Sequence, residues 1–277
     1  MLRDITLGQY YPSDSVIHRL DARTKIIWTL VYIIELFVIT DFIGFLITTA
    51  LLAAVIVLSK VPAKYILKGL KPIFIIIIFT FILNLFMIKG GDVLWEWKIF
   101  EITEGRMYRA CFMAIRLIYL IIGSSLLTFT TKPVNLTDGI EKLLKPLNRI
   151  KVPAHELAMM MTIALRFIPT LLEETDKIMK AQQARCADFE TGNILVRAKK
   201  MIPILVPLFI SAFRIAIELA MAMEARCYRG GGNRTKMNEN RFMRTDVFAS
   251  IIMLLFTSAL IILQFMQFYS LDRKSVV

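Results

Sequence analysis

The chain has 277 residues, of which 57% are apolar, and its mean hydropathy is +0.62. Soluble domains are roughly 45–50% apolar, so this composition excludes an ordinary soluble protein and indicates one that crosses a membrane. The formal net charge of +12 lies between apolar runs instead of in a separate basic domain, which disfavours a nucleic-acid partner.

Polar residues lead into the first apolar run without the small-residue cleavage pattern of a signal peptide. Five apolar runs then predict membrane-spanning helices, and the turn around Asp41 makes the first two a tight hairpin. In chain order the predicted spans are Ile26–Thr40, Phe42–Leu58, Ile73–Ile88, Tyr108–Thr130 and Val247–Ser270. Since about 20 residues are needed to cross the hydrocarbon core, the first run is short for a complete span.

The two connections that flank the third predicted span differ in charge. The Ser59–Pro72 connection has no acid and four bases: Lys60, Lys64, Lys68 and Lys71. The Lys89–Met107 connection has more acids than bases. Because cytoplasmic loops carry an excess of Lys and Arg, we expect the first connection in the cytoplasm and the second outside. The N-terminus and residues 131–246 then fall on the cytoplasmic side, where their bases would meet anionic lipid headgroups.

The region 131–246 has a mixed character. Leu136–Leu147 has leucines at helical spacing and predicts a short interfacial helix. Leu157–Leu172 and Met201–Met223 are apolar enough to span, but each holds an arginine and at least one proline. An arginine at the bilayer centre costs roughly 2.5–3.5 kcal/mol. We therefore expect two long helices along the cytoplasmic interface, with a seven-span protein as the alternative.

The sequence thus predicts an all-α polytopic membrane protein with about five transmembrane helices and long coupling helices on the cytoplasmic side. Three parts are expected: an N-terminal membrane domain (1–130) with about four spans, a coupling-helix region (131–246), and a final transmembrane helix with a C-terminal tail (247–277).

One short motif occurs twice, 41 residues apart. Ala181–Cys186 reads A-Q-Q-A-R-C, and Ala222–Cys227 reads A-M-E-A-R-C. Each copy closes an apolar-rich helical stretch and is followed by helix breakers. A single arginine near a helix C-terminus is ordinary, because it opposes the helix dipole. Two arginines in matched small-residue contexts indicate that each projects from a slim helix end and binds a carboxylate of a partner.

The repeated motif and three longer segments make the chain similar to the transmembrane T component of energy-coupling factor transporters, the EcfT or CbiQ-like family. The segments are His18–Lys25, Leu165–Glu174 and Ala222–Gly231, and the resemblance covers nearly the whole chain. It implies a non-catalytic subunit of an ABC-type vitamin or micronutrient importer in a prokaryotic cell membrane. In that family two cytoplasmic ATPase subunits dock on the paired motifs, and a separate membrane subunit binds the substrate.

The resemblance also implies which residues contact the ATPase subunits. They are Ala184, Arg185 and Cys186 in the first copy and Ala225, Arg226 and Cys227 in the second. It implies no cofactor or metal in this chain, with ATP and Mg²⁺ bound by the partner subunits. Both third positions depart from the family's common Ala-Arg-Gly. This weakens any claim that a glycine-only backbone geometry is needed there, and it leaves the arginine as the expected coupling residue.

A group of methionines lies on the same two predicted coupling helices. It includes Met159, Met160, Met161, Met221 and Met223. Because Met-rich surfaces can repack against different partners, these residues are candidate contacts with the substrate-binding subunit, and one T component could then serve several such subunits. Ordinary apolar filling of the helices is an equal alternative.

Other chemistry has little support in the sequence. Glu35 could relay protons within the first span, and Gly230–Thr235 superficially resembles a phosphate loop but lacks the lysine. His18 and His155 have no second histidine of a zinc motif, and the three cysteines have no metal-type spacing. We expect packing, linker and surface or capping roles for these residues. The competing function is a stand-alone secondary transporter, which intramembrane polar residues near broken helices would indicate.

Overall fold

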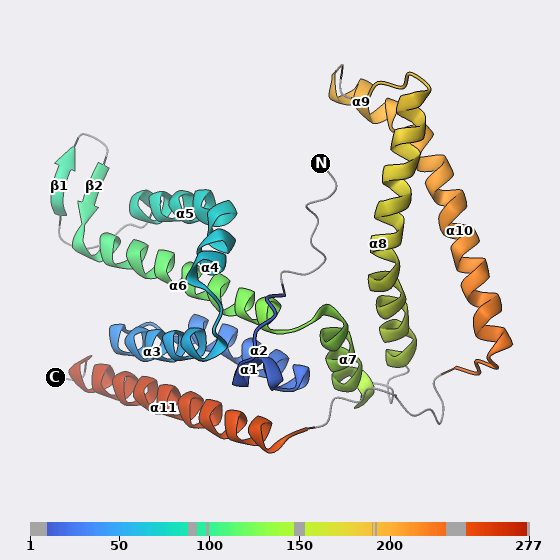
Figure 1. Cartoon of the computed structure of the whole chain (residues 1–277). Coiled ribbons are helices and arrows are strands. Elements are labelled where there is room, and N and C mark those ends of the chain that lie inside the picture. Colours follow the sequence, from blue (N-terminus) through green and yellow to red (C-terminus); the bar gives the residue numbers. More distant parts are fainter. Residues whose placement is uncertain are drawn as a thin grey trace. The chain divides into compact units, whose positions relative to one another are not determined.

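The computed structural model describes residues 10–87, 93–97, 100–146, 153–189, 191, 193–230 and 242–275. Almost all of these residues are helical (Figure 1), and the predicted all-α polytopic architecture is confirmed. The chain divides into two compact units. We call Gly8–Gly139 with Asn240–Val277 the membrane unit, and Ile140–Glu239 the helix-pair unit.

The membrane unit is built from helices near both ends of the chain. They are α1 (Val16–Arg19), α2 (Ala22–Val38), α3 (Phe42–Ser59), α4 (Ala63–Leu70), η2 (Lys71–Ile73), α5 (Phe74–Met87), α6 (Glu104–Thr130) and α11 (Arg244–Ser275). A short antiparallel hairpin of β1 (Val93–Trp97) and β2 (Phe100–Thr103) lies between α5 and α6, and the sequence did not predict it. Helix α7 (Pro133–Leu144) follows α6 and runs into the helix-pair unit.

Six helical stretches within the described residues are long and apolar enough to cross a membrane. Four of them correspond to the second to fifth predicted spans: Phe42–Ser59, Ala63–Asn84, Ala110–Thr130 and Arg244–Met266. The other two are Ala154–Ala184 and Ile202–Ala225, which the sequence assigned to the interface. The first predicted span differs, because α2 has 17 residues and is not among the six.

Polar contacts define both ends of α2. Asp21 caps the first turn by accepting a hydrogen bond from the backbone N–H of Arg23 at 3.0 Å. At the other end, Arg116 of α6 and Gln264 of α11 donate hydrogen bonds to the last carbonyls of the α2 segment. These donors satisfy carbonyl groups that have no partner within the helix at its C-terminal end. Helix α2 can therefore end inside the membrane unit, where the chain turns directly into α3.

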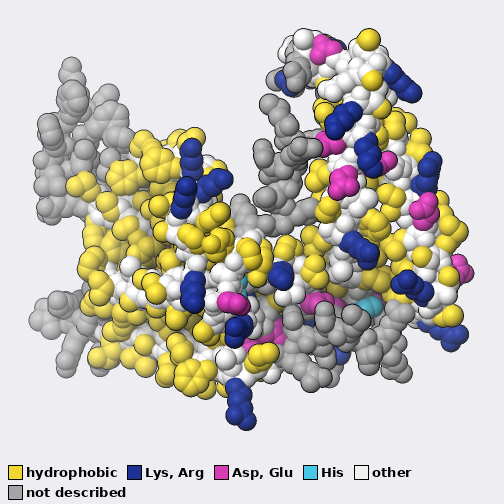
Figure 2. Space-filling model, viewed as in Figure 1, with side chains coloured by type: hydrophobic (Ala, Val, Ile, Leu, Met, Phe, Trp, Pro, Cys, Tyr) yellow, Lys and Arg dark blue, Asp and Glu magenta, His cyan; other side chains and the backbone are white. Residues whose placement is uncertain are grey.

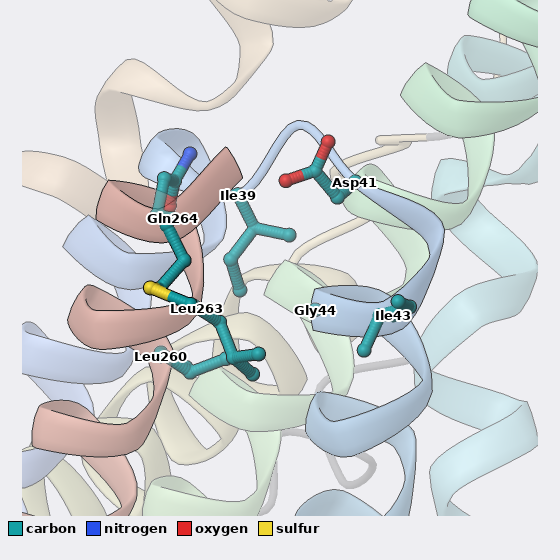
Figure 3. A pocket seen from close by; sticks show the side chains of 8 residues that line it. Ile39, Asp41, Ile43, Gly44, Leu260, Leu263 and Gln264 are labelled. Atoms are coloured by element: carbon teal, nitrogen blue, oxygen red, sulfur yellow. The ribbon is translucent and has the colours of Figure 1, made fainter. Parts of the chain in front are cut away.

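Two glycines allow close packing around α2. A Cβ atom at Gly123 of α6 would overlap the ring of Tyr32. A Cβ atom at Gly44 of α3 would lie 2.7 Å from Cγ2 of Ile39. Figure 3 shows the turn from α2 to α3, where Ile39, Gly44 and Leu260 of α11 border a small cavity of about 160 Å³. Helix α2 therefore packs directly on its neighbours in the unit.

A buried carboxylate joins the two ends of the membrane unit. Asp246, in the first turn of α11, is 0% exposed and accepts hydrogen bonds from the backbone N–H groups of Asp21 at 2.7 Å and Met243 at 2.8 Å. The buried Lys25 is attracted to this carboxylate and donates a hydrogen bond to the carbonyl of Thr130 at 2.9 Å. The starts of α2 and α11 and the end of α6 are thus fixed to one another.

The helix-pair unit contains α8 (Ala154–Ala184), α9 (Ile194–Lys200) and α10 (Ile202–Ala225). Helices α8 and α10 run antiparallel and pack on each other (Figure 1). Where α10 ends, the hydroxyl of Tyr228 donates to Sδ of Met159, near the start of α8, at 3.0 Å. Figure 2 shows basic and acidic side chains along this unit, whereas the face of the membrane unit in the same view is largely hydrophobic.

Candidate partner-docking site

The first copy of the repeated motif forms the C-terminal end of α8. Arg185 is the cap residue, with φ −92° and ψ 21°, and Cys186 follows in the left-handed region with φ 62°. The backbone N–H of Cys186 donates to the carbonyl of Gln183, and that of Ala187 donates to the carbonyl of Gln182, each at 3.0 Å. These two bonds form a Schellman motif, which ends the helix.

The second copy forms the C-terminal end of α10 with the same backbone pattern. Arg226 is the cap residue, with φ −91° and ψ 14°, and Cys227 has φ 54°. The N–H of Cys227 donates to the carbonyl of Glu224 at 2.8 Å, and that of Tyr228 donates to the carbonyl of Met223 at 3.1 Å. The repeat in sequence is therefore also a repeat in local structure.

Both cysteines occupy a position that usually favours glycine. A left-handed backbone costs a residue with a Cβ atom roughly 1–2 kcal/mol, and glycine is the common residue after a helix cap for this reason. The departure from Ala-Arg-Gly predicted that a glycine-only backbone geometry is not needed there. The structure agrees with this, because Cys186 and Cys227 adopt the left-handed backbone without being glycine.

Replacing either cysteine by glycine should stabilise its helix end. Cys186→Gly and Cys227→Gly relieve the left-handed strain, so we expect a gain of about 1 kcal/mol in the free energy of unfolding of the last turn. Hydrogen exchange of the last-turn amides of α8 and α10 measures this gain as slower exchange. Cys111→Gly is the matched control, because Cys111 lies inside α6, where glycine destabilises a helix. Faster exchange in the first two variants would contradict the strain argument.

Neither arginine caps the carbonyls of its own helix. Arg185 and Arg226 are exposed, as are the preceding Ala184 and Ala225. Among the residues that the structure describes, neither guanidinium group has a hydrogen bond or an ion pair. Each offers five N–H donors from a slim helix end, which is the arrangement that a carboxylate of a partner can bind.

The two arginines lie at opposite ends of the helix pair, because α8 and α10 are antiparallel and each carries its arginine at the C-terminus (Figure 1). Helix α10 has 24 residues, which corresponds to a length of roughly 36 Å. The two motifs are thus too far apart to form one small site, and they suit two separate binding surfaces.

The candidate methionines gather at the end of the helix pair that carries Arg226. Met159 accepts the hydrogen bond of Tyr228, and the carbonyl of Met223 accepts the N–H of the same residue. The largest exposed fractions in this group belong to Met160, Met161 and Met221. The structure therefore brings methionines of both helices to the same end of the helix pair, which the sequence alone did not indicate.

The other polar residues that the sequence singled out have local contacts. His155 Nδ1 lies 3.0 Å from Oε1 of Glu141, and the ring of His18 bonds the carbonyl of Tyr11 at 2.9 Å. Burial lowers the pKa of His18. The buried carboxyl group of Glu35 lies near the hydroxyl of Thr257 on α11. A proton-relay role for Glu35 stays a prediction. Of the glycine-rich segment 230–235, only the first residue lies inside the described part.

Sequence reasoning missed the buried Asp246. Its signal was available, because an acid directly before a long charge-free run is typical of a helix N-terminus. Nothing in the sequence indicated that this carboxylate bonds Asp21, which is 225 residues away. Within the described residues, no group of three His, Cys, Asp or Glu side chains could hold a metal ion.

Known proteins are similar to this chain across both the membrane unit and the helix-pair unit. The family model of CbiQ, described as cobalt transport protein, matches residues 13–237. The energy-coupling factor transporter transmembrane protein EcfT of Clostridium kluyveri is 58% identical over 252 residues, which are 91% of this chain and 93% of that one. EcfT of Thermosediminibacter oceani is 60% identical over 250 residues (90% and 94%). EcfT of Bacillus subtilis is 45% identical over 256 residues (92% and 97%).

Proposed function

The chain belongs to the CbiQ/EcfT family of energy-coupling factor transporter transmembrane proteins, and on that basis we propose that Arg185 and Arg226 dock two cytoplasmic ATPase subunits. The chain is a multi-pass membrane protein and the T subunit of such a transporter. It transmits ATP-driven motion to a separate membrane subunit that binds a vitamin or another micronutrient. In this proposal the chain catalyses nothing itself, because ATP and Mg²⁺ bind to the ATPase subunits.

The observation that carries the proposal is the pair of matched helix ends. Two partner subunits of similar structure present two similar sockets, and the chain offers two Schellman ends with nearly the same dihedral angles at Arg185 and Arg226. Charge-assisted, bidentate arginine–carboxylate bonds are among the strongest side-chain hydrogen bonds. An arginine that only compensates the helix dipole would not need to recur in a second helix end of matching sequence and backbone geometry.

The antiparallel arrangement constrains how the helix pair lies relative to the membrane. If α8 and α10 both crossed the bilayer, their C-terminal ends would lie on opposite sides. Only one arginine could then reach a cytoplasmic partner. Both reach the cytoplasm if the pair lies along the inner surface of the membrane, although α8 and α10 are long and apolar enough to cross it.

The charge of the connecting segments supports the orientation in which the helix pair lies along the inner surface of the membrane. The three connections before, between and after α8 and α10 each have more bases than acids: residues 131–153, 185–201 and 226–246. Cytoplasmic loops carry such an excess, so all three are expected on one side of the membrane. The exposed side chains of Arg166 on α8 and Arg214 on α10 then meet water and lipid headgroups instead of hydrocarbon.

The mechanism follows from the positions of the two arginines. ATP binding closes the pair of ATPase subunits, and each subunit carries one arginine-tipped helix end with it. The two arginine-carrying ends lie at opposite ends of the helix pair. When the ATPase subunits close and move both ends, α8 and α10 therefore rotate relative to each other. The exposed apolar side chains of α10 pass this rotation to the substrate-binding subunit: Ile202, Val206, Phe209, Phe213 and Ile217.

The methionines of α8 allow a separate prediction about which substrate-binding subunits the chain binds. Replacing Met159, Met160 and Met161 by isoleucine keeps the residues apolar but removes flexible, polarisable side chains. We expect this variant to lose some substrate-binding subunits in pull-down assays and to retain others. Equal loss of every subunit, or no loss at all, would contradict an adaptable surface and favour simple apolar filling.

Purification from native membranes tests the proposed function. ATP-hydrolysing subunits and a small membrane protein should copurify with the chain, and the chain alone in lipid vesicles should transport nothing. Substrate transport by the isolated chain would overturn the proposal in favour of a stand-alone secondary transporter.

A further inference from the structure

A short amphipathic helix connects two spans of the membrane unit. Helix α4 follows α3 and leads through η2 into α5. In Figure 1 it runs across the direction shared by α3, α5 and α6. Ile66 of α4 is 6% exposed and packs with Leu126 and Phe129 of α6. Helix α4 therefore lies beside the last two turns of α6, and its other face is turned away from these helices.

The outward face of α4 carries a row of lysines. Lys64 and Lys68 of α4 and Lys71 of η2 recur at i, i+4 and i+7, which places them on one side of the helix. All three side chains are exposed. Ile66 and Gly69 lie on the opposite side, where a Cβ atom at Gly69 would contact α6. We call Lys64, Lys68 and Lys71 the lysine face.

The lysine face has no counter-charge within the described part of the chain. None of its three ammonium groups has a hydrogen bond or an ion pair there. Helices α3, α4, η2 and α5 contain no acid. The one acid in the α6 sequence is Glu104, its first residue, at the end away from α4. Like charges at i and i+4 destabilise a helix, and an anion from outside the chain would remove this repulsion.

Apolar side chains border the lysine face on both sides. Tyr65 is 46% exposed and Leu67 is 64% exposed. A helix with lysines on its polar face and exposed apolar neighbours is typical of the membrane–water interface. Lysine stems lie along apolar surface there, while the ammonium groups reach the headgroups. A free phosphate ion would match only the charge, whereas a lipid also covers the two apolar side chains.

We propose that the lysine face binds the phosphate groups of anionic glycerophospholipids in the inner leaflet. The Ser59–Pro72 connection is expected on the cytoplasmic side because of its excess of bases. Anionic lipids attract such basic segments, and each lysine near the membrane surface strengthens binding roughly fivefold. The contact fixes the depth of this end of the membrane unit in the bilayer. It involves neither arginine of the docking motifs, so it is independent of the proposed ATPase contacts.

Native mass spectrometry of the purified full chain tests the proposal with two lipids. Dioleoylphosphatidylglycerol has a net negative charge, whereas dioleoylphosphatidylcholine has none. The wild-type chain should bind the first lipid more tightly than the second. Lys68→Gln should weaken the binding of phosphatidylglycerol roughly fivefold and leave the binding of phosphatidylcholine unchanged. Lys68→Arg should retain the wild-type affinity, because the positive charge is kept.

Lys60→Gln is the matched control for the loss of charge. Lys60 is exposed and belongs to the same acid-free connection, but it is the cap residue of α3 and precedes α4. Its variant should bind phosphatidylglycerol as the wild type does. Equal weakening by Lys60→Gln and Lys68→Gln would overturn the proposal, because net charge alone would then explain the binding.

Two further outcomes would also overturn the proposal. One is equal affinity of the wild-type chain for the two lipids. The other is loss of phosphatidylglycerol binding when the ATPase subunits are bound, which would assign the lysine face to an acidic protein surface. Copurification of the ATPase subunits should be unchanged in the variants of Lys60 and Lys68, whereas failure of the proposed docking would appear in the variants of Arg185 and Arg226.

Discussion

Replacing both Arg185 and Arg226 by alanine should abolish substrate uptake while the protein remains inserted in the membrane. Truncating one partner of a buried, hydrogen-bonded charge pair costs about 2–5 kcal/mol, and here both contacts are lost. At 1.4 kcal/mol for each tenfold change, each site alone should weaken ATPase binding at least about twentyfold. Uptake by intact cells and pull-down of the ATPase subunits measure the two effects.

Two further substitutions separate docking from general loss of charge. Arg229→Ala removes an exposed arginine two residues beyond the second motif and should leave uptake unchanged. Arg226→Lys keeps the charge but loses the planar fork of donors, so it should weaken binding although the charge is conserved. Full transport by the double alanine variant would refute the docking role of both residues.

Replacing Asp246 by alanine should strongly destabilise the membrane unit. The side chain is fully buried and accepts two backbone hydrogen bonds. Its loss leaves the N–H groups of Asp21 and Met243 without that acceptor and removes a counter-charge of Lys25. Leaving a buried donor unsatisfied costs roughly 1–3 kcal/mol, and two donors lose their acceptor here, so thermal unfolding in detergent should begin at a clearly lower temperature.

An exposed acid in the same unit provides the control for this prediction. Asp14 forms a surface ion pair with Arg19 at 3.7 Å, and its side chain is almost fully exposed. Asp14→Ala should leave the melting temperature nearly unchanged, because surface pairs contribute little. Asp246→Asn should be intermediate, since the amide keeps one oxygen acceptor. Equal melting temperatures for the Asp14 and Asp246 alanine variants would contradict the role of the buried carboxylate.

The helical architecture could be predicted because its causes are local. Long apolar runs between polar connections require membrane helices. The predicted span Phe42–Leu58 agrees with α3 to within one residue at its end. Membership of the EcfT family, predicted from the residues around the two motifs, is confirmed by the comparisons. Helix α2 ends two residues before the predicted Thr40, where Arg116 and Gln264 from distant helices bond the carbonyls that the helix end leaves open.

The arrangement of the candidate site depended on tertiary packing and was not predictable. The sequence identified Arg185 and Arg226 as matched helix ends, but their opposite positions result from the antiparallel packing of α8 and α10. The left-handed backbone at Cys186 and Cys227 was not predicted, because a cysteine gives no local signal for it. The hydrogen bond between Asp246 and Asp21 joins residues too distant in sequence for any periodicity to relate them.

The two motif cysteines provide the most direct measurement of whether both arginine tips face the cytoplasm. Cys186 and Cys227 are exposed and adjacent to the arginines, and Cys111 can be replaced by serine. With a membrane-impermeant maleimide, neither motif cysteine should react in intact cells. Both should react in inside-out vesicles stripped of the ATPase subunits, and bound ATPase subunits should protect both. Reaction of either cysteine from outside the cell would mean that α8 and α10 cross the membrane, and it would contradict the proposed coupling mechanism.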